Sequence, residues 1–393
     1  MADRRWVNPP RLRSVDREPG ERHATWVELF FDLAFVVAIA QLSHLISNDP
    51  SAKSFLHYGL LFAPVWFIWV GFTVYADRFD TDDVPHRLAV LAGMVVIAAL
   101  AVHVDDAFTG GSIPFALCSI FARAILVAMN VRAMRAVPAA RAFIAYYVRG
   151  WSIGLLLWVV SLAVPEPGRY VVWGLAVLVE VATPLVAERR LGSIPLHVSH
   201  IGERFGLFTI VVLGESVVSV TAGIAEVDFD LANSLIGVGA FALAAALAWV
   251  YFDRLGSDLV GSTSYVYAHF VVYLGLAAVG PGTLLAIEAA DDSALPAGAR
   301  AALCGGTALY LLGLCLVAAP RRALPSERRR IAARCIAAGA AVAIAFLGAA
   351  LAPVATVLLL AGVAVGDLVY ELVAGADPLE QSASPFDLAQ EDA

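Results

Sequence analysis

The sequence predicts an all-α membrane protein, a polytopic bundle of about twelve transmembrane helices in two parallel six-helix repeats. Of the 393 residues, 60% are hydrophobic and 15% are charged, and the mean hydropathy is +0.78, well above the composition of soluble domains. Apolar runs of about 20 residues, long enough to cross a bilayer, recur along the chain. Short motifs in the first half also return in the second half.

The predicted spans end where charged residues, prolines or glycines interrupt the apolar runs. In the first half they cover residues 27–47, 55–77, 86–104, 113–134, 141–163 and 169–187. In the second half they cover residues 203–224, 231–252, 265–287, 298–318, 329–350 and 353–374. We interpret residues 1–22, which are rich in arginine, as a basic cytoplasmic tail without a cleavable signal peptide. Residues 375–393 are polar and acidic, and we expect them to be disordered.

The distribution of basic residues predicts the orientation, because short cytoplasmic loops collect Lys and Arg. With the N-terminus inside, most of the 26 Lys and Arg residues fall in inner segments, Arg204 among them. The outer loops hold Lys53, Arg169 and Arg300 and are otherwise acidic. We therefore expect an even number of spans with both termini in the cytoplasm. The net charge of -8 comes from acidic loops and the acidic tail, and it predicts no nucleic-acid partner.

An internal repeat with an offset of about 175 residues relates the two halves. At this offset "ELFFDLAFVVAIA" lies beside "ERFGLFTIVVLGE", so that Glu28 aligns with Glu203. With a shift of one residue, "VYADRF" lies on "VYFDRL". The aligned residues are Tyr75, Asp77 and Arg78 with Tyr251, Asp253 and Arg254, and His86 and His269 then open the next spans. We predict repeats at 23–190 and 191–374, parallel because each holds an even number of spans.

Two long motifs, "HATWVELFFDLAFVVAIAQLSHLI" and "ERFGLFTIVVLGESVVSV", resemble the bacterial low temperature requirement protein A family, LtrA, from about residue 20 to about residue 374. The resemblance implies a polytopic protein of the bacterial inner membrane, named for a growth defect in the cold, and it implies no particular substrate. A shorter similarity, at Phe31 and Asp32, is to the lysosomal potassium and proton channel family. The chain departs from that pattern at Phe30, Gly206 and Leu207.

Two acids stand at the start of the first span. Thr25 and Glu28 fit a capping box, which satisfies free amides of the first helical turn and explains Glu28 without any functional role. Asp32 lies about 6 Å deeper by helix rise. A lipid-facing charge at that depth is costly, so we expect Asp32 to face protein or water.

Further charges fall inside the predicted spans. Glu215 lies about 18 Å beyond Glu203 along its helix, where a carboxylate costs about 2.5–3.5 kcal/mol and needs a partner, a proton or a water-filled cavity. It either joins helices with Ser216 and Ser219 or takes part in transport. Arg123 and Glu180 are candidates for buried ionic partners. An acid stands in the last span of each half, Glu180 in the first half and Asp367 or Glu371 in the second. We expect Arg149 and Arg334 to reach the interface.

The repeated Tyr-x-Asp-Arg motif stands at the inner ends of two spans. It fits an aromatic belt with an interfacial ion pair. Our second hypothesis is a brace that pairs Arg78 with Glu28 and Arg254 with Glu203, or the reverse across the repeats. The histidines, including His86, His200 and His269, fall at predicted membrane edges, where His is more often interfacial than a ligand, although His86 and His269 could titrate near neutral pH.

These features predict a transporter or channel for a proton, another ion or a small solute, with the lipid bilayer as its surroundings. The alternative is a non-transporting membrane protein that serves adaptation to low temperature or to the state of the lipids. We expect no enzyme activity, no cofactor and no metal site, because the sequence holds no Gly-rich phosphate loop, nucleophile elbow or His-x-x-x-His pattern. The four cysteines fall in apolar stretches and are expected to be reduced.

Overall fold

The computed structural model describes residues 6–13, 24–192, 194, 196–227, 230–253 and 262–375. Within them the chain is α-helical apart from two short strands, β1 (Arg11–Leu12) and β2 (Phe79–Asp80), which pair antiparallel. Twelve helical segments in this described part are long and apolar enough to cross a membrane. The predicted all-α fold with about twelve spans is therefore confirmed.

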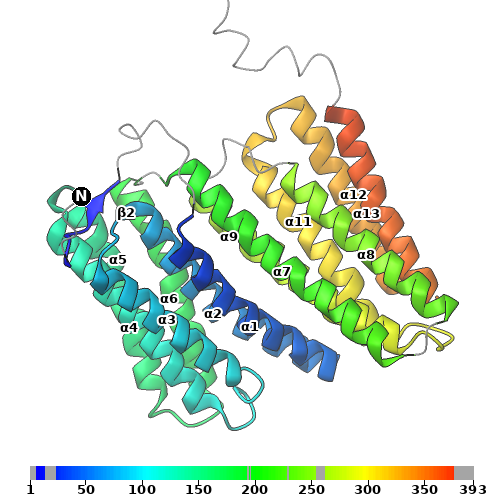
Figure 1. Cartoon of the computed structure of the whole chain (residues 1–393), viewed down its shortest axis with the longest axis horizontal. Coiled ribbons are helices and arrows are strands. Elements are labelled where there is room, and N and C mark those ends of the chain that lie inside the picture. The colour runs from blue at the N-terminus through cyan, green and yellow to red at the C-terminus, as the bar shows by residue number, and fades with distance from the viewer. Residues whose placement is uncertain are drawn as a thin grey trace, which may run out of the picture. The chain divides into compact units, whose positions relative to one another are not determined.

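The helices follow the predicted spans with shifts of a few residues at their ends (Figure 1). The first six are α1 (Trp26–Asn48), α2 (Ala52–Arg78), α3 (Val84–Val102), α4 (Ser112–Ala136), α5 (Arg141–Ser161), preceded by the short η1 (Pro138–Ala140), and α6 (Gly168–Leu191). The next three are α7 (Val198–Glu226), α8 (Leu231–Phe252) and α9 (Thr263–Glu288). The tenth span is continuous through α10 (Ala297–Arg300), the π-helical η2 (Ala301–Gly305), α11 (Gly306–Ala318) and η3 (Ala319–Arg321). The last two are α12 (Pro325–Leu347) and α13 (Pro353–Gly375).

Side chains at the helix starts satisfy backbone amides that have no partner within the helix. Thr25 and Glu28 form the predicted capping box of α1. Ser51, Asp83 and Asp230 cap α2, α3 and α8, and each accepts a hydrogen bond from the amide three residues further on. These caps fix where each helix begins at the edge of the apolar region.

The chain divides into two compact units, and both α7 and α9 contribute to each. The first unit comprises residues 1–215 and 255–270, and the second comprises residues 216–254 and 271–393. These units follow packing, whereas the predicted repeats at 23–190 and 191–374 follow sequence resemblance, so the repeat boundaries stay a prediction. The predicted acidic tail beyond residue 375 and most of the basic tail lie outside the described residues.

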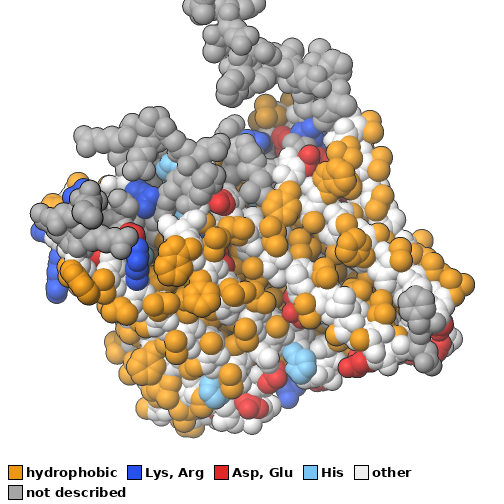
Figure 2. All heavy atoms as spheres, viewed as in Figure 1, with side chains coloured by type: hydrophobic (Ala, Val, Ile, Leu, Met, Phe, Trp, Pro, Cys, Tyr) orange, Lys and Arg blue, Asp and Glu red, His pale blue; other side chains and the backbone are white. Residues whose placement is uncertain are grey.

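In the first unit α1 packs on α2 and α3, α4 packs on α3 and α5, and α5 packs on α6. Its core is aromatic where α2 meets α7. The ring centroids of Trp69 and Phe208 lie 4.3 Å apart, and those of Trp66 and Phe205 lie 5.9 Å apart. Figure 2 shows hydrophobic side chains over the visible face of these helices. Large hydrophobic side chains of this unit are exposed, among them Val95 and Leu178, as expected of a surface that contacts the lipid bilayer.

In the second unit α8 packs on α13, and α12 packs on α11 and α13. Glycines bring α9 close to the tenth span. A Cβ at Gly275 would lie 2.4 Å from the backbone nitrogen of Tyr310, and one at Gly282 would lie 2.4 Å from that of Leu303. Backbones approach this closely only where side chains are absent, which is typical of helix contacts inside membranes.

Candidate functional site

A buried ion pair joins α1 to α7. Asp32 and Arg204 are 2% and 1% exposed. The guanidinium of Arg204 donates from Nε to Asp32 Oδ2 over 3.0 Å and from Nη2 to Oδ1 over 2.6 Å. Trp69 on α2 donates from its indole nitrogen to Oδ1 over 2.7 Å. Asp32 therefore faces protein rather than lipid, as predicted. Arg204 holds its carboxylate by a bidentate, charge-assisted contact.

One turn before this pair, His200 lies between two carboxylates. Its Nδ1 is 2.9 Å from Asp77 Oδ1 at the end of α2, and its Nε2 is 3.3 Å from Glu28 Oε2 on α1. The imidazole is fully buried. Asp77 also accepts a hydrogen bond from the amide of His197, just before α7, where the helix dipole favours negative charge. The result is a buried carboxylate–imidazole–carboxylate chain.

The two contacts share one register. Glu28 and Asp32 are four residues apart on α1, and His200 and Arg204 are four residues apart on α7. Residues at this spacing lie on one face of a helix. Glu28 therefore meets His200 and Asp32 meets Arg204 at successive turns, which places two acids opposite a histidine and an arginine.

The starts of the two helices are also tied by backbone contacts. Glu28 Oε2 accepts from the amide of Thr25 over 2.7 Å, as the capping box requires. The amide of Ala24 donates to Glu203 Oε2 on α7 over 2.9 Å. Glu28 thus has the structural role that the sequence predicted, and it also reaches His200.

A cavity adjoins these groups at the same end of the helices. About 180 Å³ of it is open to molecules the size of water. Its walls include Glu28 and Arg204 from the network, together with Asp82, His86 and Arg87 from the β2–α3 region. A space of this size with several polar groups can hold ordered water, and it lies directly beside the buried charges of the network.

A second buried pair lies deeper in the first unit. Arg123 on α4 donates to Glu180 on α6 over 2.5 Å and 2.9 Å, and its guanidinium lies 4.6 Å from the ring centroid of Trp158. The sequence named Arg123 and Glu180 as candidates without assigning partners, and the structure pairs them with each other. Neutralisation of this kind makes the two charges tolerable within apolar spans.

The second unit has its own buried charges on α12 and α13. Arg334 Nη2 lies 2.8 Å from Glu371 Oε1, and Arg330 lies 2.9 Å from Glu327. Asp367 is 5% exposed. The prediction that Arg334 reaches the interface is wrong, because it is 3% exposed and faces Glu371. Arg149 is exposed.

The predicted brace between Arg78 and Glu28 is wrong. The guanidinium of Arg78 lies over the rings of Phe143 and Tyr147, 4.9 Å and 5.1 Å from their centroids. His200 and Thr25 take the contacts of Glu28 that the brace required. Arg254 lies outside the described residues, so the second brace is not described.

The other sequence candidates are dispersed. The Tyr75 ring stacks on His86 with centroids 5.9 Å apart, and the Tyr251 hydroxyl lies 3.4 Å from that of Tyr273. Asp253 is exposed at the end of α8. His269 is buried within the protein, 1% exposed, and its Nδ1 lies 2.8 Å from the carbonyl oxygen of Tyr265.

Glu215 and Ser216 lie further along α7. Glu215 is partly buried and lies about 16 Å beyond Arg204 by helix rise. Ser216 is 3% exposed, and a Cβ at Gly280 would approach its backbone to 3.2 Å. The two residues therefore lie apart from the charges at the start of α7.

The sequence analysis did not assign a site role to His200 or Arg204. His200 was expected at a membrane edge, just before the predicted span 203–224, and Arg204 was counted only among the basic residues of the inner side. Helix α7 begins at Val198, so both residues are helical. A signal was present in the spacing, because His200 and Arg204 repeat the four-residue interval of Glu28 and Asp32 at a constant offset.

Comparison with known proteins identifies the family. The chain matches the family described as "Bacterial low temperature requirement A protein (LtrA)" over residues 23–366. This chain belongs to the LtrA family. It is also 28% identical over 206 residues to an uncharacterized protein of Rhizobium meliloti (strain 1021), and this match covers 50% of each chain. The family match includes the α1 and α7 residues of the buried network, so the network is part of the LtrA region of this chain.

Proposed function

We propose that this LtrA-family protein moves an ion or small solute across the bacterial inner membrane, with proton exchange at His200 coupled to that movement. The observation that carries the proposal is the buried chain of Glu28, His200 and Asp77 beside a cavity that can hold water. Ionisable side chains within membrane spans are costly, and they commonly mark proton relays and ion pathways.

The chemistry of the chain suits proton transfer. Histidine is the side chain whose ordinary titration falls between pH 5 and 8. A proton taken up at one imidazole nitrogen can leave from the other, and the carboxylates of Glu28 and Asp77 stabilise the charged ring between them. Asp32 and Arg204 stand beside this site as a pair whose opposite charges cancel. Glu203 at the start of α7 and the partly buried Glu215 are the next acids on the proposed path.

The alternative interpretation of the network is a purely structural role. Asp77, Glu28 and Glu203 all satisfy amides at the starts of α1 and α7, which stabilises those helices without any transport. A structural network works best when it is dry and fully paired. The network instead adjoins a cavity beside Glu28 and Arg204 that is large enough for water, and this supports the proposed transport function.

We also propose that the two halves of the chain are duplicated and parallel, with both termini in the cytoplasm. The motifs that recur at an offset of about 175 residues, with Glu28 aligned to Glu203, support this proposal. The distribution of basic residues supports the orientation. Protease accessibility of tags placed at each terminus in inside-out vesicles tests it.

Flux measurements in liposomes test the transport function. Purified protein is reconstituted with a pH-sensitive dye inside the vesicles, and gradients of protons, potassium, sodium and small organic solutes are imposed in turn. We expect dye-reported proton movement with at least one of these gradients. His200→Gln keeps hydrogen bonding but cannot titrate, and we expect it to lower the coupled flux about a hundredfold or more, the low end of what general acid–base groups contribute.

The matched control is His44→Gln, because the His44 side chain is 55% exposed and outside the network. It should transport like the unmodified protein. If vesicles with protein are no faster than empty vesicles under every gradient, the transport function is wrong and the non-transporting role in cold or lipid adaptation replaces it. If His200→Gln transports at the full rate, the coupling through His200 is wrong.

A further inference from the structure

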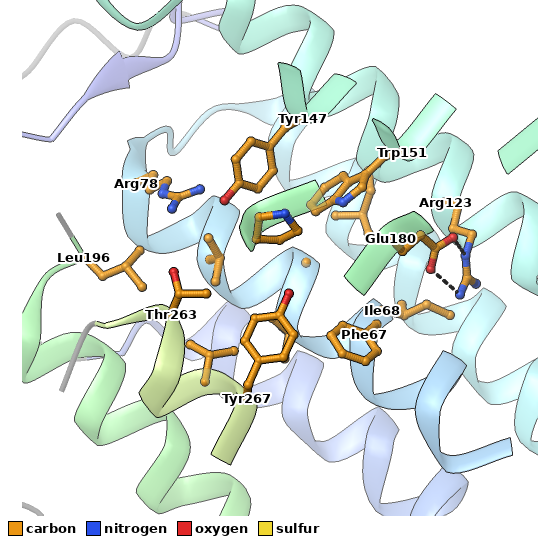
Figure 3. A pocket seen from close by; sticks show the side chains of 16 residues that line it. Phe67, Ile68, Arg78, Arg123, Tyr147, Trp151, Glu180, Leu196, Thr263 and Tyr267 are labelled. Carbon is orange, nitrogen blue, oxygen red and sulfur yellow. Dashed lines mark hydrogen bonds and ion pairs between the residues drawn. The ribbon is translucent and has the colours of Figure 1, made fainter. Parts of the chain in front are cut away.

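A second cavity lies in the first unit, between α2, α4, α5, α6 and the start of α9. About 60 Å³ of it is open to molecules the size of water, within a wider space of about 740 Å³ that includes its open mouth. Figure 3 shows its aromatic and aliphatic walls, among them Phe67, Trp151 and Tyr267. The lining is apolar except near its two ends.

One end of the cavity carries a cation that forms no ion pair with the residues that the structure describes. Arg78 ends α2, and its guanidinium is held by the rings of Phe143 and Tyr147. Its Nε is buried without a hydrogen-bond partner, and no carboxylate of the described residues forms an ion pair with it. The Tyr147 hydroxyl points toward this guanidinium in Figure 3. A guanidinium offers five donors in a planar fork that fits phosphate or carboxylate.

At the other end of the cavity the charges neutralise each other. There Arg123 and Glu180 pair with each other (Figure 3). From Arg78 to Phe67 the wall formed by α2 extends about 16 Å by helix rise. This is about half of the 30 Å hydrocarbon thickness of a bilayer. The cavity therefore has the depth of one leaflet, with the positive charge of Arg78 at the end of the candidate membrane span α2.

We infer that this cavity binds one acyl chain of an anionic phospholipid, with the headgroup phosphate on Arg78 and the chain between Trp151 and Tyr267. Charge complementarity selects an anionic headgroup. The bilayer is the source because α2, α4, α5 and α6 are all candidate membrane spans. The site shares no residue with the Glu28–His200–Asp77 chain, so it stands independently of the proposed transport function.

Native mass spectrometry tests the inference. Purified protein in detergent is mixed with palmitoyl-oleoyl phosphatidylglycerol, with the corresponding phosphatidylcholine, or with oleate, and retained adducts are measured against lipid concentration. We expect tighter binding of phosphatidylglycerol. Arg78→Gln should weaken it about tenfold or more, as expected for loss of hydrogen bonds to a charged group. Val74→Trp, one turn before Arg78 in the cavity wall, should block it by filling the space.

The control is Arg149→Gln, which removes an exposed arginine of α5 and should leave binding unchanged. Equal affinity for the two phospholipids, or full phosphatidylglycerol binding by Arg78→Gln, overturns the inference. Binding of oleate without phosphatidylglycerol overturns the phospholipid as the occupant. A measurement that needs no change at Arg78 uses phosphatidylglycerol with brominated chains, which should quench the unmodified protein more than Trp151→Phe. Equal quenching places the chain elsewhere.

Discussion

Removal of the Asp32 charge tests the central contact of the site. Asp32 accepts two hydrogen bonds from Arg204 and one from the Trp69 indole, and it is 2% exposed. Asp32→Asn keeps the size of the side chain but leaves the buried guanidinium without its counter-charge. Breaking a buried pair by removing one partner costs about 3–5 kcal/mol. We expect a loss of that size in the free energy of unfolding.

The assay is unfolding in mixed micelles by increasing SDS, followed by circular dichroism. The matched control is Asp82→Asn, which breaks the exposed pair with Arg87, whose side chains are 68% and 43% exposed. Exposed pairs contribute about 0–1 kcal/mol. The two aspartate-to-asparagine changes should therefore differ several-fold in cost, because Asp32 is buried and Asp82 is exposed.

A double-mutant cycle isolates the pair itself. Arg204→Gln alone should also be strongly destabilising, since it leaves the Asp32 carboxylate buried and uncompensated. The double variant should cost much less than the sum of the two single changes, because no unpaired charge remains. Additive costs, or a loss below about 1 kcal/mol for Asp32→Asn, the size expected of a surface pair, refute the buried ion pair.

Two further predictions concern packing and acid stability. Gly275→Ala should destabilise the second unit by about 1–3 kcal/mol, because its Cβ would lie 2.4 Å from the Tyr310 nitrogen. Gly339→Ala is the control and should leave the stability unchanged, because there is open space around Gly339. Equal SDS unfolding curves for the two variants would contradict this prediction. Burial raises the pKa of Asp83, but hydrogen bonds from Arg132 and backbone amides outweigh it, so the pKa lies below its usual range. The stability that the Asp83–Arg132 pair provides is present above about pH 4 and is lost as the pH falls further. Asp83→Asn should remove this acid-dependent loss of stability. An unchanged dependence of stability on pH in the variant would contradict the prediction.

The candidate site could be predicted from the sequence only in part. Depth within a span identified Asp32, Arg123 and Glu180, because the cost of a charge in lipid does not depend on which partner relieves it. Glu28 followed from the local capping pattern. The partners of these charges could not be predicted from the sequence. Arg78 was assigned to Glu28 by depth alone, whereas the Phe143 and Tyr147 rings take its guanidinium.

The sequence by itself determined that the chain spans a membrane and where its helices lie, because a helix in lipid satisfies its own backbone hydrogen bonds and needs only a long apolar run. The tertiary structure decided which charges meet. His200 and Arg204 stand near a loop in the sequence, and they became buried only because the start of α7 packs beside α1 and the end of α2. Such contacts join residues that lie far apart in the chain, and hydropathy does not show which of these residues meet.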